Sequence, residues 1–288
     1  MIYGGDLFGL RNKYDMAIDR IRTFEPAEGY YLAFSGGKDS QAVYHLAQEA
    51  GVMFDAHYHL TTVDPPELVR FIRANYPDVT IEKPKATMWE LIVKCKMPPT
   101  RTVRYCCDIL KEGGGKGRTV ITGVRRAESQ RRRDRPIMTL NLGRKSEIRL
   151  NSDNDEVRRM FETCQKKGKN VLNPVVDWTE AEVWEYLNGN SIQHCSLYDE
   201  GFTRLGCIGC PLAGQNHMLM EFERWPKYYD AYLRAFDRML MARREAGMDN
   251  GKWTSAQDVM DWWTSADRNP TVDLSNLSTL DDFMEVFS

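Results

Sequence analysis

An apolar run, a glycine turn and an amphipathic helix follow one another between Tyr30 and Gly51, and this order restricts the fold more than any other segment. Residues 30–34 (YYLAF) are apolar and aromatic, which is typical of a buried strand. The Ser35-Gly36-Gly37 sequence interrupts that run, and small apolar residues then recur at helical spacing as far as Gly51. A buried strand that leads directly into a helix indicates the first half of a parallel crossover.

The same alternation continues as far as residue 123. Further strands are expected at 52–60, 79–82 and 119–123, and helices at 65–75 and 88–96. We therefore expect an α/β fold with a doubly wound, mostly parallel sheet. Beyond about residue 151 helices are expected at 156–167, 179–187, 218–224 and 226–246. This pattern divides the chain into an N-terminal helical segment (1–25), an α/β domain (26–212) and a C-terminal helical region (213–288) packed on that domain.

Composition is that of an ordinary globular protein. The chain has 288 residues, a formal net charge of −2 and no apolar run long enough to span a bilayer. Residues 1–10 lack the basic start and apolar core of a secretory signal, so we expect a cytoplasmic protein with no membrane partner. Its seven cysteines form an odd number with clustered spacings, which in a reducing compartment indicates metal ligands or free thiols.

The turn after the first expected strand has the chemistry of an anion site. Glycines let the backbone approach a phosphate closely, and the start of the following helix presents free N–H groups and a positive dipole. Lys38 adds a positive charge that can hold a triphosphate, provided that it lies at a cavity, and Asp39 can hold a magnesium ion or its water shell. The candidate nucleotide-binding residues of this turn are Ser35, Gly36, Gly37, Lys38, Asp39 and Ser40.

Positive charge is concentrated in the middle of the chain. Residues 101–150 contain 14 Lys and Arg against 5 Asp and Glu. Guanidinium groups bind phosphate oxygens in pairs, so arginines that follow the strand at 119–123 are suited to a polyphosphate. The later arginines of this run are equally well explained as a solvated loop or as a contact for a nucleic acid backbone. The run consists of Arg125, Arg126, Arg131, Arg132, Arg133 and Arg135.

Four of the cysteines form two close pairs. Cys106 and Cys107 are adjacent, and Cys207 and Cys210 are separated by two residues, with Gly206 and Gly209 beside them. Folding can bring the pairs together as a four-thiolate site for zinc or for an iron–sulfur cluster, and spacing alone does not choose between the two. The remaining cysteines, Cys95, Cys164 and Cys195, are unpaired in sequence and are predicted to be structural.

The turn and several downstream segments together resemble a known family. SGGKDS, with the strand before it, is similar to the PP-loop of enzymes that cleave ATP between the α and β phosphates. Together with the downstream segments the chain resembles the phosphoadenosine phosphosulfate (PAPS) reductase family of the adenine nucleotide alpha-hydrolase superfamily, and in its features the DNA phosphorothioation members most. The downstream segments are residues 62–67 (TVDPPE), 123–129 (GVRRAES), 173–178 (NPVVDW), with Trp184, and 201–211 (GFTRLGCIGCP).

The resemblance implies roles for particular residues. In the family the GxRxxES block lines the nucleotide site, which here implies Gly123, Arg125, Glu128 and Ser129. ATP with Mg²⁺ is then the implied ligand. Relatives with a Cys-Cys pair and a CxxC pair carry a 4Fe-4S cluster, which favours iron over zinc on Cys106, Cys107, Cys207 and Cys210. The implied catalytic residues are Lys38, Asp39 and Arg125.

Three functions are consistent with these features. The first is an ATP pyrophosphatase that adenylates an acceptor, from which sulfur or another nucleophile displaces AMP. The second is a reductase of PAPS or adenosine phosphosulfate; it fits less well, because such enzymes usually lack the lysine of the loop and need a cysteine beyond Cys210 as nucleophile. The third is a non-catalytic nucleotide-sensing subunit. We rank the first highest, with a nucleic acid as one candidate acceptor and a cysteine desulfurase as a candidate sulfur donor; the sequence does not predict an oligomeric state.

Overall fold

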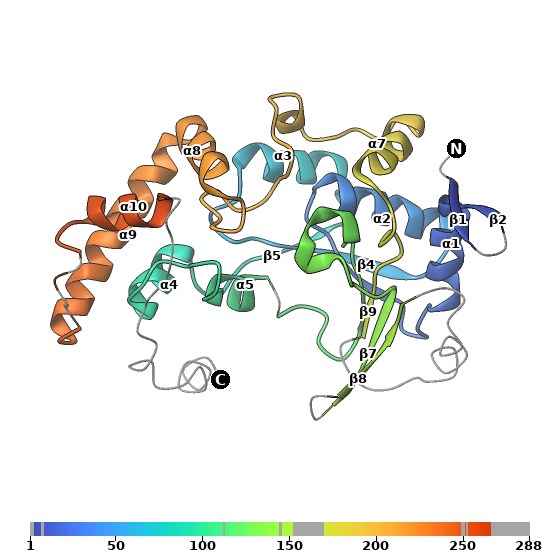
Figure 1. Cartoon of the computed structure of the whole chain (residues 1–288), viewed down its shortest axis with the longest axis horizontal. Coiled ribbons are helices and arrows are strands. Elements are labelled where there is room, and N and C mark those ends of the chain that lie inside the picture. Colours follow the sequence, from blue (N-terminus) through green and yellow to red (C-terminus); the bar gives the residue numbers. More distant parts are fainter. Residues whose placement is uncertain are drawn as a thin grey trace.

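The centre of the protein is a seven-stranded sheet with the strand order β5-β4-β3-β6-β9-β7-β8 (Figure 1). The structure is a computed structural model that describes residues 3–6, 9–111, 113–143, 146–151, 170–248, 251 and 253–265. Strands β5, β4, β3, β6 and β9 are parallel, whereas β7 is antiparallel to both β9 and β8. The strands are β3 (Tyr30–Ala33), β4 (Phe54–His59), β5 (Thr80–Glu82), β6 (Thr119–Ile121), β7 (Met138–Gly143), β8 (Ser146–Leu150) and β9 (Asn170–Leu172).

The order of the strands creates a reversal point beside β3. The chain moves outward from β3 to β4 and β5, and then returns to β6 on the opposite side of β3. Tyr31 and Leu32 of β3 pair with Val120 and Ile121 of β6. Open α/β sheets bind ligands at the carboxyl ends of strands where the order reverses. The topology therefore points to the ends of β3 and β6 as a ligand site.

Four helices lie close to the sheet. They are α1 (Lys13–Thr23), α2 (Lys38–Ala50), α3 (Pro66–Asn75) and α7 (Glu180–Gly189), and Figure 1 shows α2, α3 and α7 on the upper side of the sheet. Helix α2 packs between α1 and α7. It ends at Gly51, whose φ of 71° is the left-handed conformation that favours glycine at a helix end. Its packing against α1 and α7 holds the first turn of α2 at the carboxyl end of β3.

The remaining helices form a group beyond the β5 side of the sheet (Figure 1). Helix α9 packs against α4, α8 and α10, and Trp263 of α10 is fully buried there. In the part of the chain that the structure describes, no helix is both long and apolar enough to cross a membrane. These helices are α4 (Met88–Cys95), α5 (Tyr105–Leu110), α8 (Gln215–Arg224), α9 (Pro226–Glu245) and α10 (Ala256–Thr264).

The α/β class and the mostly parallel sheet are confirmed, and the differences from the prediction are local. The second half contributes strands as well as helices: β7 and β8 form a hairpin on the sheet, and β9 lies between β6 and β7. Strands β1 (Tyr3–Asp6) and β2 (Gly9–Asn12) pair ahead of α1, where only a helical segment was predicted. The helix predicted at 156–167 lies outside the described residues.

A buried ion pair fastens α1 to the loop after β9. Arg20 is 2% exposed, and its two terminal nitrogens donate to the two carboxylate oxygens of Asp177 at 2.9 Å each. Arg20 also donates to the carbonyl oxygen of Pro174 at 2.7 Å. Burial alone would raise the pKa of Asp177, but the hydrogen bonds and charge of Arg20 outweigh it and lower that pKa. The NPVVDW segment thus acts here as an anchor for α1.

We expect Arg20→Met to destabilise the protein by about 3 kcal/mol, because it leaves the Asp177 carboxylate without its partner. The measurement is the free energy of unfolding in a denaturant titration. Arg70→Met is the matched control, since the Arg70 side chain is 73% exposed in its ion pair with Glu67 and should matter by less than about 0.5 kcal/mol. Equal effects of the two substitutions would contradict the anchoring role of Arg20.

The same pair predicts a pH dependence. The pKa of Asp177 is lowered in the folded protein, so its contribution to stability is complete above the unfolded value of about 4 and is lost as the pH falls through the folded value. We expect the stability difference between the wild type and Asp177→Asn to be constant near neutral pH and to shrink below about pH 4. A difference that does not change with pH would argue against a charged Asp177.

Candidate functional site

The turn between β3 and α2 is built from glycine backbone and serine hydroxyls. Gly36 has a φ of 71°, and a Cβ atom at this position would lie 2.7 Å from Cδ1 of Ile72, so glycine is required. The Ser40 hydroxyl donates to the carbonyl oxygen of Gly37 at 2.9 Å and accepts from the Ser35 N–H at 3.1 Å. Ser35 also donates through its hydroxyl to Ser40 at 3.0 Å. Ser35, Gly37 and Ser40 thus form one hydrogen-bonded unit at the start of α2.

Lys38 is held inside the protein. Its predicted role requires an ammonium group that is exposed at an open cavity, so the structure differs from the prediction at this residue. It is 4% exposed, and its ammonium group donates to the carbonyl oxygen of Thr203 at 3.1 Å. The Glu180 carboxylate lies 3.4 Å from the same Nζ atom, and that of Asp39 lies 3.8 Å away. The backbone N–H of Lys38 donates to the hydroxyl of Tyr198 at 2.9 Å. Both donors of this residue therefore have internal oxygen partners.

The segment after β6 reaches across to the first turn of α2. A Cβ atom on Gly123 would lie 2.6 Å from the carbonyl oxygen of Asp39, so only glycine allows this approach. Arg125 is 2% exposed and donates through Nε to the Asp39 carboxylate at 2.6 Å and through a terminal nitrogen to the carbonyl oxygen of Trp178 at 3.3 Å. The Arg125 N–H donates to the Glu128 carboxylate at 2.7 Å. Two separate segments of the chain thus meet at Asp39.

Burial dominates the electrostatics of Asp39. It raises the pKa of the carboxyl group, against the opposing effects of Lys38 and then Arg125. A positive ion at this carboxylate would offset the same desolvation, because it stabilises the charged form. The environment of Asp39 is therefore suited to a carboxylate that binds a cation together with a ligand.

Some arginines of the basic run make hydrogen bonds or ion pairs with neighbouring segments, and others are exposed. Arg126 donates to the carbonyl oxygens of Arg135 and Asn151, and Arg132 pairs with Glu128. These contacts shape the short 3₁₀ turns η1 (Arg126–Glu128) and η2 (Gln130–Arg132). Ser129 lies exposed at the junction of the two turns, and Arg131, Arg133 and Arg135 are exposed as well. The structure therefore places Arg125, Gly123 and Glu128 at the turn, and Ser129 and the later arginines at the surface.

The two cysteine pairs lie near each other, although no three His, Cys, Asp or Glu side chains of the described residues are grouped as ligands of one metal ion. Cys106 and Cys107 lie in the first turn of α5, and Cys207 and Cys210 flank a tight turn before α8. The hydrogen bond between Cys106 and Cys107 raises the pKa of Cys106 and lowers that of Cys107, and the charges of Cys207 and Cys210 also raise that of Cys106. The Cys207 thiol donates to the Thr61 hydroxyl at 3.3 Å. All four thiols therefore interact within one region of the protein.

The turn between Cys207 and Cys210 is fixed from three sides. The Ile208 N–H donates to the carbonyl oxygen of Val63 at 2.8 Å, and the Tyr232 hydroxyl donates to the carbonyl oxygen of Ile208 at 2.9 Å. The Gly209 N–H donates to the Glu221 carboxylate at 2.7 Å. Gly209 has a φ of 74°, and a Cβ atom there would lie 2.8 Å from Cζ of Phe222. The turn is thus preorganised by the loop after β4 and by helices α8 and α9.

Four residues of these sites were missed by the sequence analysis. Lys111, just after α5, lies beside Cys207, whose negative charge raises the pKa of the lysine. Tyr198, Glu180 and Thr203 contact Lys38, as described above. Nothing local in the sequence distinguishes these residues, because each acts through a contact with a distant segment.

The two unpaired cysteines that the structure describes are structural, as predicted. Cys95 and Cys195 are 7% and 1% exposed. Burial raises the pKa of both thiols, which opposes reactivity. Cys164 lies outside the described residues.

The segment of this chain that resembles known proteins includes both the β3–α2 turn and the two cysteine pairs. Residues 29–213 match the phosphoadenosine phosphosulfate reductase domain. Two uncharacterized proteins of Methanocaldococcus jannaschii are 28% and 27% identical to this chain, over 216 and 214 residues. These alignments cover 72% and 70% of the chain but 47% and 40% of the two relatives, so the chain spans about half of their length or less.

An enzyme and a solved structure are also similar. The adenosine 5'-phosphosulfate reductase of Staphylococcus haemolyticus is 24% identical over 215 residues, which are 69% of this chain and 76% of that protein. The PAPS reductase of Candida auris, solved as a crystal structure, has a TM-score of 0.45 and 18% identity, over 66% of this chain and 87% of that chain.

The contact between Gly123 and Asp39 predicts a steric effect. We expect Gly123→Ala to destabilise the protein by about 1–3 kcal/mol, because the new methyl group meets backbone atoms that cannot rotate away. The measurement is again the free energy of unfolding. Gly189→Ala is the matched control, since a Cβ atom there has no neighbour within 4 Å and the residue ends helix α7. Similar values for the two variants would show that the close approach at Gly123 is relieved at little cost.

Proposed function

Because this chain belongs to the phosphoadenosine phosphosulfate reductase domain family, we propose that it is an enzyme that binds ATP with Mg²⁺ at the β3–α2 turn and cleaves it between the α and β phosphates. One observation carries the proposal. The intact SGGKDS turn lies where the strand order reverses, and Arg125 from the neighbouring strand end contacts Asp39 of that turn at 2.6 Å. Two cationic side chains, Lys38 and Arg125, and the Asp39 carboxylate are therefore gathered at the turn where we expect a polyphosphate.

In the proposed reaction, the residues at the turn bind different phosphates of ATP. Lys38 and the first N–H groups of α2 bind the β and γ phosphates and stabilise the charge that develops on them. An oxygen atom of the acceptor forms a bond to the α phosphorus while the bond from that phosphorus to the bridging oxygen breaks, and pyrophosphate leaves with the bonding electrons. Arg125, held by Asp39 and Trp178, is positioned to neutralise charge at the α phosphate.

The donor set at the turn fits a magnesium ion. Mg²⁺ is usually held by one or two carboxylates together with substrate phosphates. One oxygen of Asp39 accepts from Arg125, and the other is 3.8 Å from Lys38 and can serve the ion. Bound there, Mg²⁺ would neutralise the phosphate oxygens that face the turn.

We propose that the four thiols hold a 4Fe-4S cluster, with a single zinc ion as the alternative. Zinc–sulfur bonds of about 2.3 Å require all four sulfur atoms to lie within about 4 Å of one another. Among the residues that the structure describes, no three His, Cys, Asp or Glu side chains are arranged to hold one ion in this way. The charges of Cys207 and Cys210 act on Cys106, so the four thiols lie in one region, and the family resemblance favours a 4Fe-4S cluster over zinc as the group that they would hold. Bound there, the cluster would place a strongly polarising group near the end of β4.

A sulfonucleotide reductase is the second candidate. It is favoured by the similarity to the Staphylococcus haemolyticus enzyme, whose alignment covers 69% of this chain. It would use the same turn to hold adenosine phosphosulfate and, with two electrons from a dithiol that is oxidised to a disulfide, would release sulfite and AMP. We rank this function second because the chain has Lys38, which suits the β and γ phosphates of ATP.

Transfer of sulfur to an adenylated acceptor is the proposed purpose of ATP cleavage. AMP is a good leaving group, so the terminal sulfur of a persulfide on a donor protein such as a cysteine desulfurase can bond to the acceptor as AMP leaves with the acceptor's oxygen. A thiol reductant would then break the disulfide that joins the acceptor to the donor cysteine. Arg131 and Arg133 are exposed near the turn segment that carries Arg125 and are suited to an anionic acceptor such as a nucleic acid. The intact SGGKDS turn and the four-cysteine set are the features on which we propose that the chain is nearest to the DNA phosphorothioation members.

We expect purified protein with Mg²⁺ to convert ATP to AMP and pyrophosphate, and Lys38→Ala to lower the rate by about 100-fold or more, because the developing charge loses its ammonium partner. Product chromatography measures both nucleotides. Lys227→Ala on the exposed face of α9 is the charge-matched control and should retain the wild-type rate. Release of ADP instead of AMP would contradict the assignment, and release of sulfite from adenosine phosphosulfate without ATP cleavage would support the reductase.

We expect anaerobically purified protein to be brown, with a broad visible absorption band and about four iron atoms per chain. Cys207→Ser should lose the band and the iron, because it removes one of the four thiolates. Cys95→Ala is the matched control, since this buried cysteine lies outside the four-thiol group, and it should keep both. A colourless protein that contains one zinc ion per chain would contradict the cluster.

A further inference from the structure

One face of α2 carries a row of polar residues, Lys38, Gln41, His45 and Glu49, spaced by three or four positions. Residues 190–203, which follow α7, lie along this row, and we name them the α2 strap. Near its start, the carbonyl oxygen of Gln193 accepts a hydrogen bond from the side chain of Gln41 at 2.7 Å. Gln41 is fully buried, so this contact is a fixed point of the strap.

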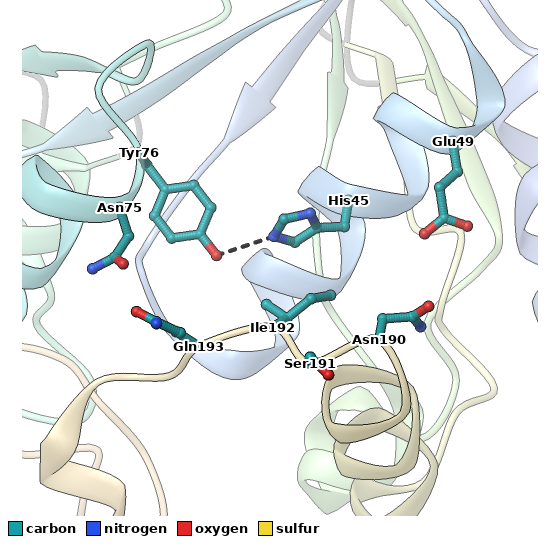
Figure 2. Close-up of a pocket in the computed structure, with 8 residues that line it drawn as sticks. All are labelled: His45, Glu49, Asn75, Tyr76, Asn190, Ser191, Ile192 and Gln193. Carbon is teal, nitrogen blue, oxygen red and sulfur yellow. Dashed lines mark hydrogen bonds between the residues drawn. The ribbon is translucent and has the colours of Figure 1, made fainter.

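The strap is not packed continuously against α2. Before Gln193, a cavity of about 450 Å³ separates the strap from the helix, and Figure 2 shows His45 and Glu49 on one side of it and residues 190–193 on the other. The cavity is mostly polar, and His45 in it lies 3.2 Å from the Tyr76 hydroxyl. At this end of the strap, hydrogen bonds such as that between Gln41 and Gln193 connect it to α2, and packing is not continuous.

The far end of the strap occupies the donors of the phosphate-binding turn. The Tyr198 hydroxyl accepts the Lys38 backbone N–H at 2.9 Å, and the Thr203 carbonyl oxygen accepts from the Lys38 ammonium group at 3.1 Å. Glu180, at the start of α7, places a carboxylate 3.4 Å from the same ammonium group. Two neutral oxygen atoms and one anion thus take the positions at Lys38 that phosphate oxygens would take.

We propose that the α2 strap closes the phosphate-binding turn and that Tyr198 and Glu180 compete with the nucleotide for Lys38, so that binding requires the end of the strap to be displaced. The proposal rests on the proposed function, because it assumes that a polyphosphate binds at this turn. Phosphate oxygens are charged and make stronger hydrogen bonds than a tyrosine hydroxyl or a carbonyl, so they win this competition at sufficient concentration.

The geometry indicates which part of the strap moves. Leu197 is fully buried and keeps the middle of the strap in place, whereas Gly201 has a φ of 91° and space for a Cβ atom on every side. The Tyr198 ring contacts the edge of Trp184 at 4.9 Å between centroids. Rotation of the Tyr198 side chain would free the Lys38 N–H, and a turn of the Thr203 carbonyl group would free the ammonium group while Phe202, which is 5% exposed, stays in the core.

The test measures ATP binding, with Mg²⁺, by calorimetry of the full chain and of three variants. Tyr198→Phe keeps the ring and removes only the competing oxygen, and we expect its dissociation constant to fall about fivefold, the equivalent of about 1 kcal/mol. Glu180→Gln removes the competing charge and should also bind ATP more tightly. Tyr229→Phe, in which the lost hydroxyl contacts Gln257 at the surface, is the matched control and should bind as the wild type does.

Hydrogen exchange gives an independent measurement. Saturating ATP should speed amide exchange in peptides that cover residues 196–206 of the wild type, because the strap end is released. Weaker binding by Tyr198→Phe, with slower exchange in these peptides, would show that Tyr198 is a nucleotide contact and would overturn the proposal. Equal affinities for all variants would overturn it too, while the proposed function would stand. If neither the wild type nor Tyr198→Phe binds ATP, the proposed function itself falls, and the strap proposal with it.

Discussion

The contact between Asp39 and the segment after β6 is the constraint on which the rest of the site depends. It joins the first turn of α2 to the neighbouring strand end across the point where the strand order reverses. Gly123 permits the approach, and the buried guanidinium group of Arg125 compensates the carboxylate that the approach buries. Without this bridge, the two halves of the sheet would present their loops independently, and no single position would be surrounded by both Lys38 and Arg125.

Burying a charged group costs free energy unless the group is paired. Among the described residues, each buried cation is therefore paired with several oxygen atoms. Arg20 has Asp177 and Pro174, Arg125 has Asp39 and Trp178, and Lys38 has Glu180 and Thr203. The pairs differ in one respect. The partners of the two arginines belong to segments that also carry the fold, whereas Lys38 is paired by Glu180 of α7 and by Thr203 of the α2 strap, which is bordered by a cavity. Among these three cations, Lys38 thus has the partners that a ligand can replace most readily, and Lys38 is the residue proposed to bind a phosphate.

Elements with strong local patterns were predicted, and those that depend on distant partners were not. The strand at Tyr30, helix α2 and its end at Gly51 follow from apolar spacing and glycine chemistry, and the structure has them within a few residues of the prediction. Strand β9 has only three residues, and its place between β6 and β7 is decided by pairing. The site shows the same division: the turn and the cysteine pairs are visible in sequence, whereas Tyr198 and Lys111 matter only through contacts with Lys38 and Cys207.

The turn and the cysteine region are connected through the end of β4 and through the strap. Val63 and Thr61, just beyond β4, hold Ile208 and Cys207, while Thr203 holds Lys38. Only residues 204–206 separate the carbonyl group that binds Lys38 from the first cysteine of the CxxC pair. The cysteine turn is anchored at Ile208 and Gly209 by α8 and α9, so a movement of Thr203 must be absorbed within those three residues. A nucleotide that takes Lys38 from Thr203 would therefore change the backbone directly beside Cys207 while leaving the rest of the cysteine turn in place.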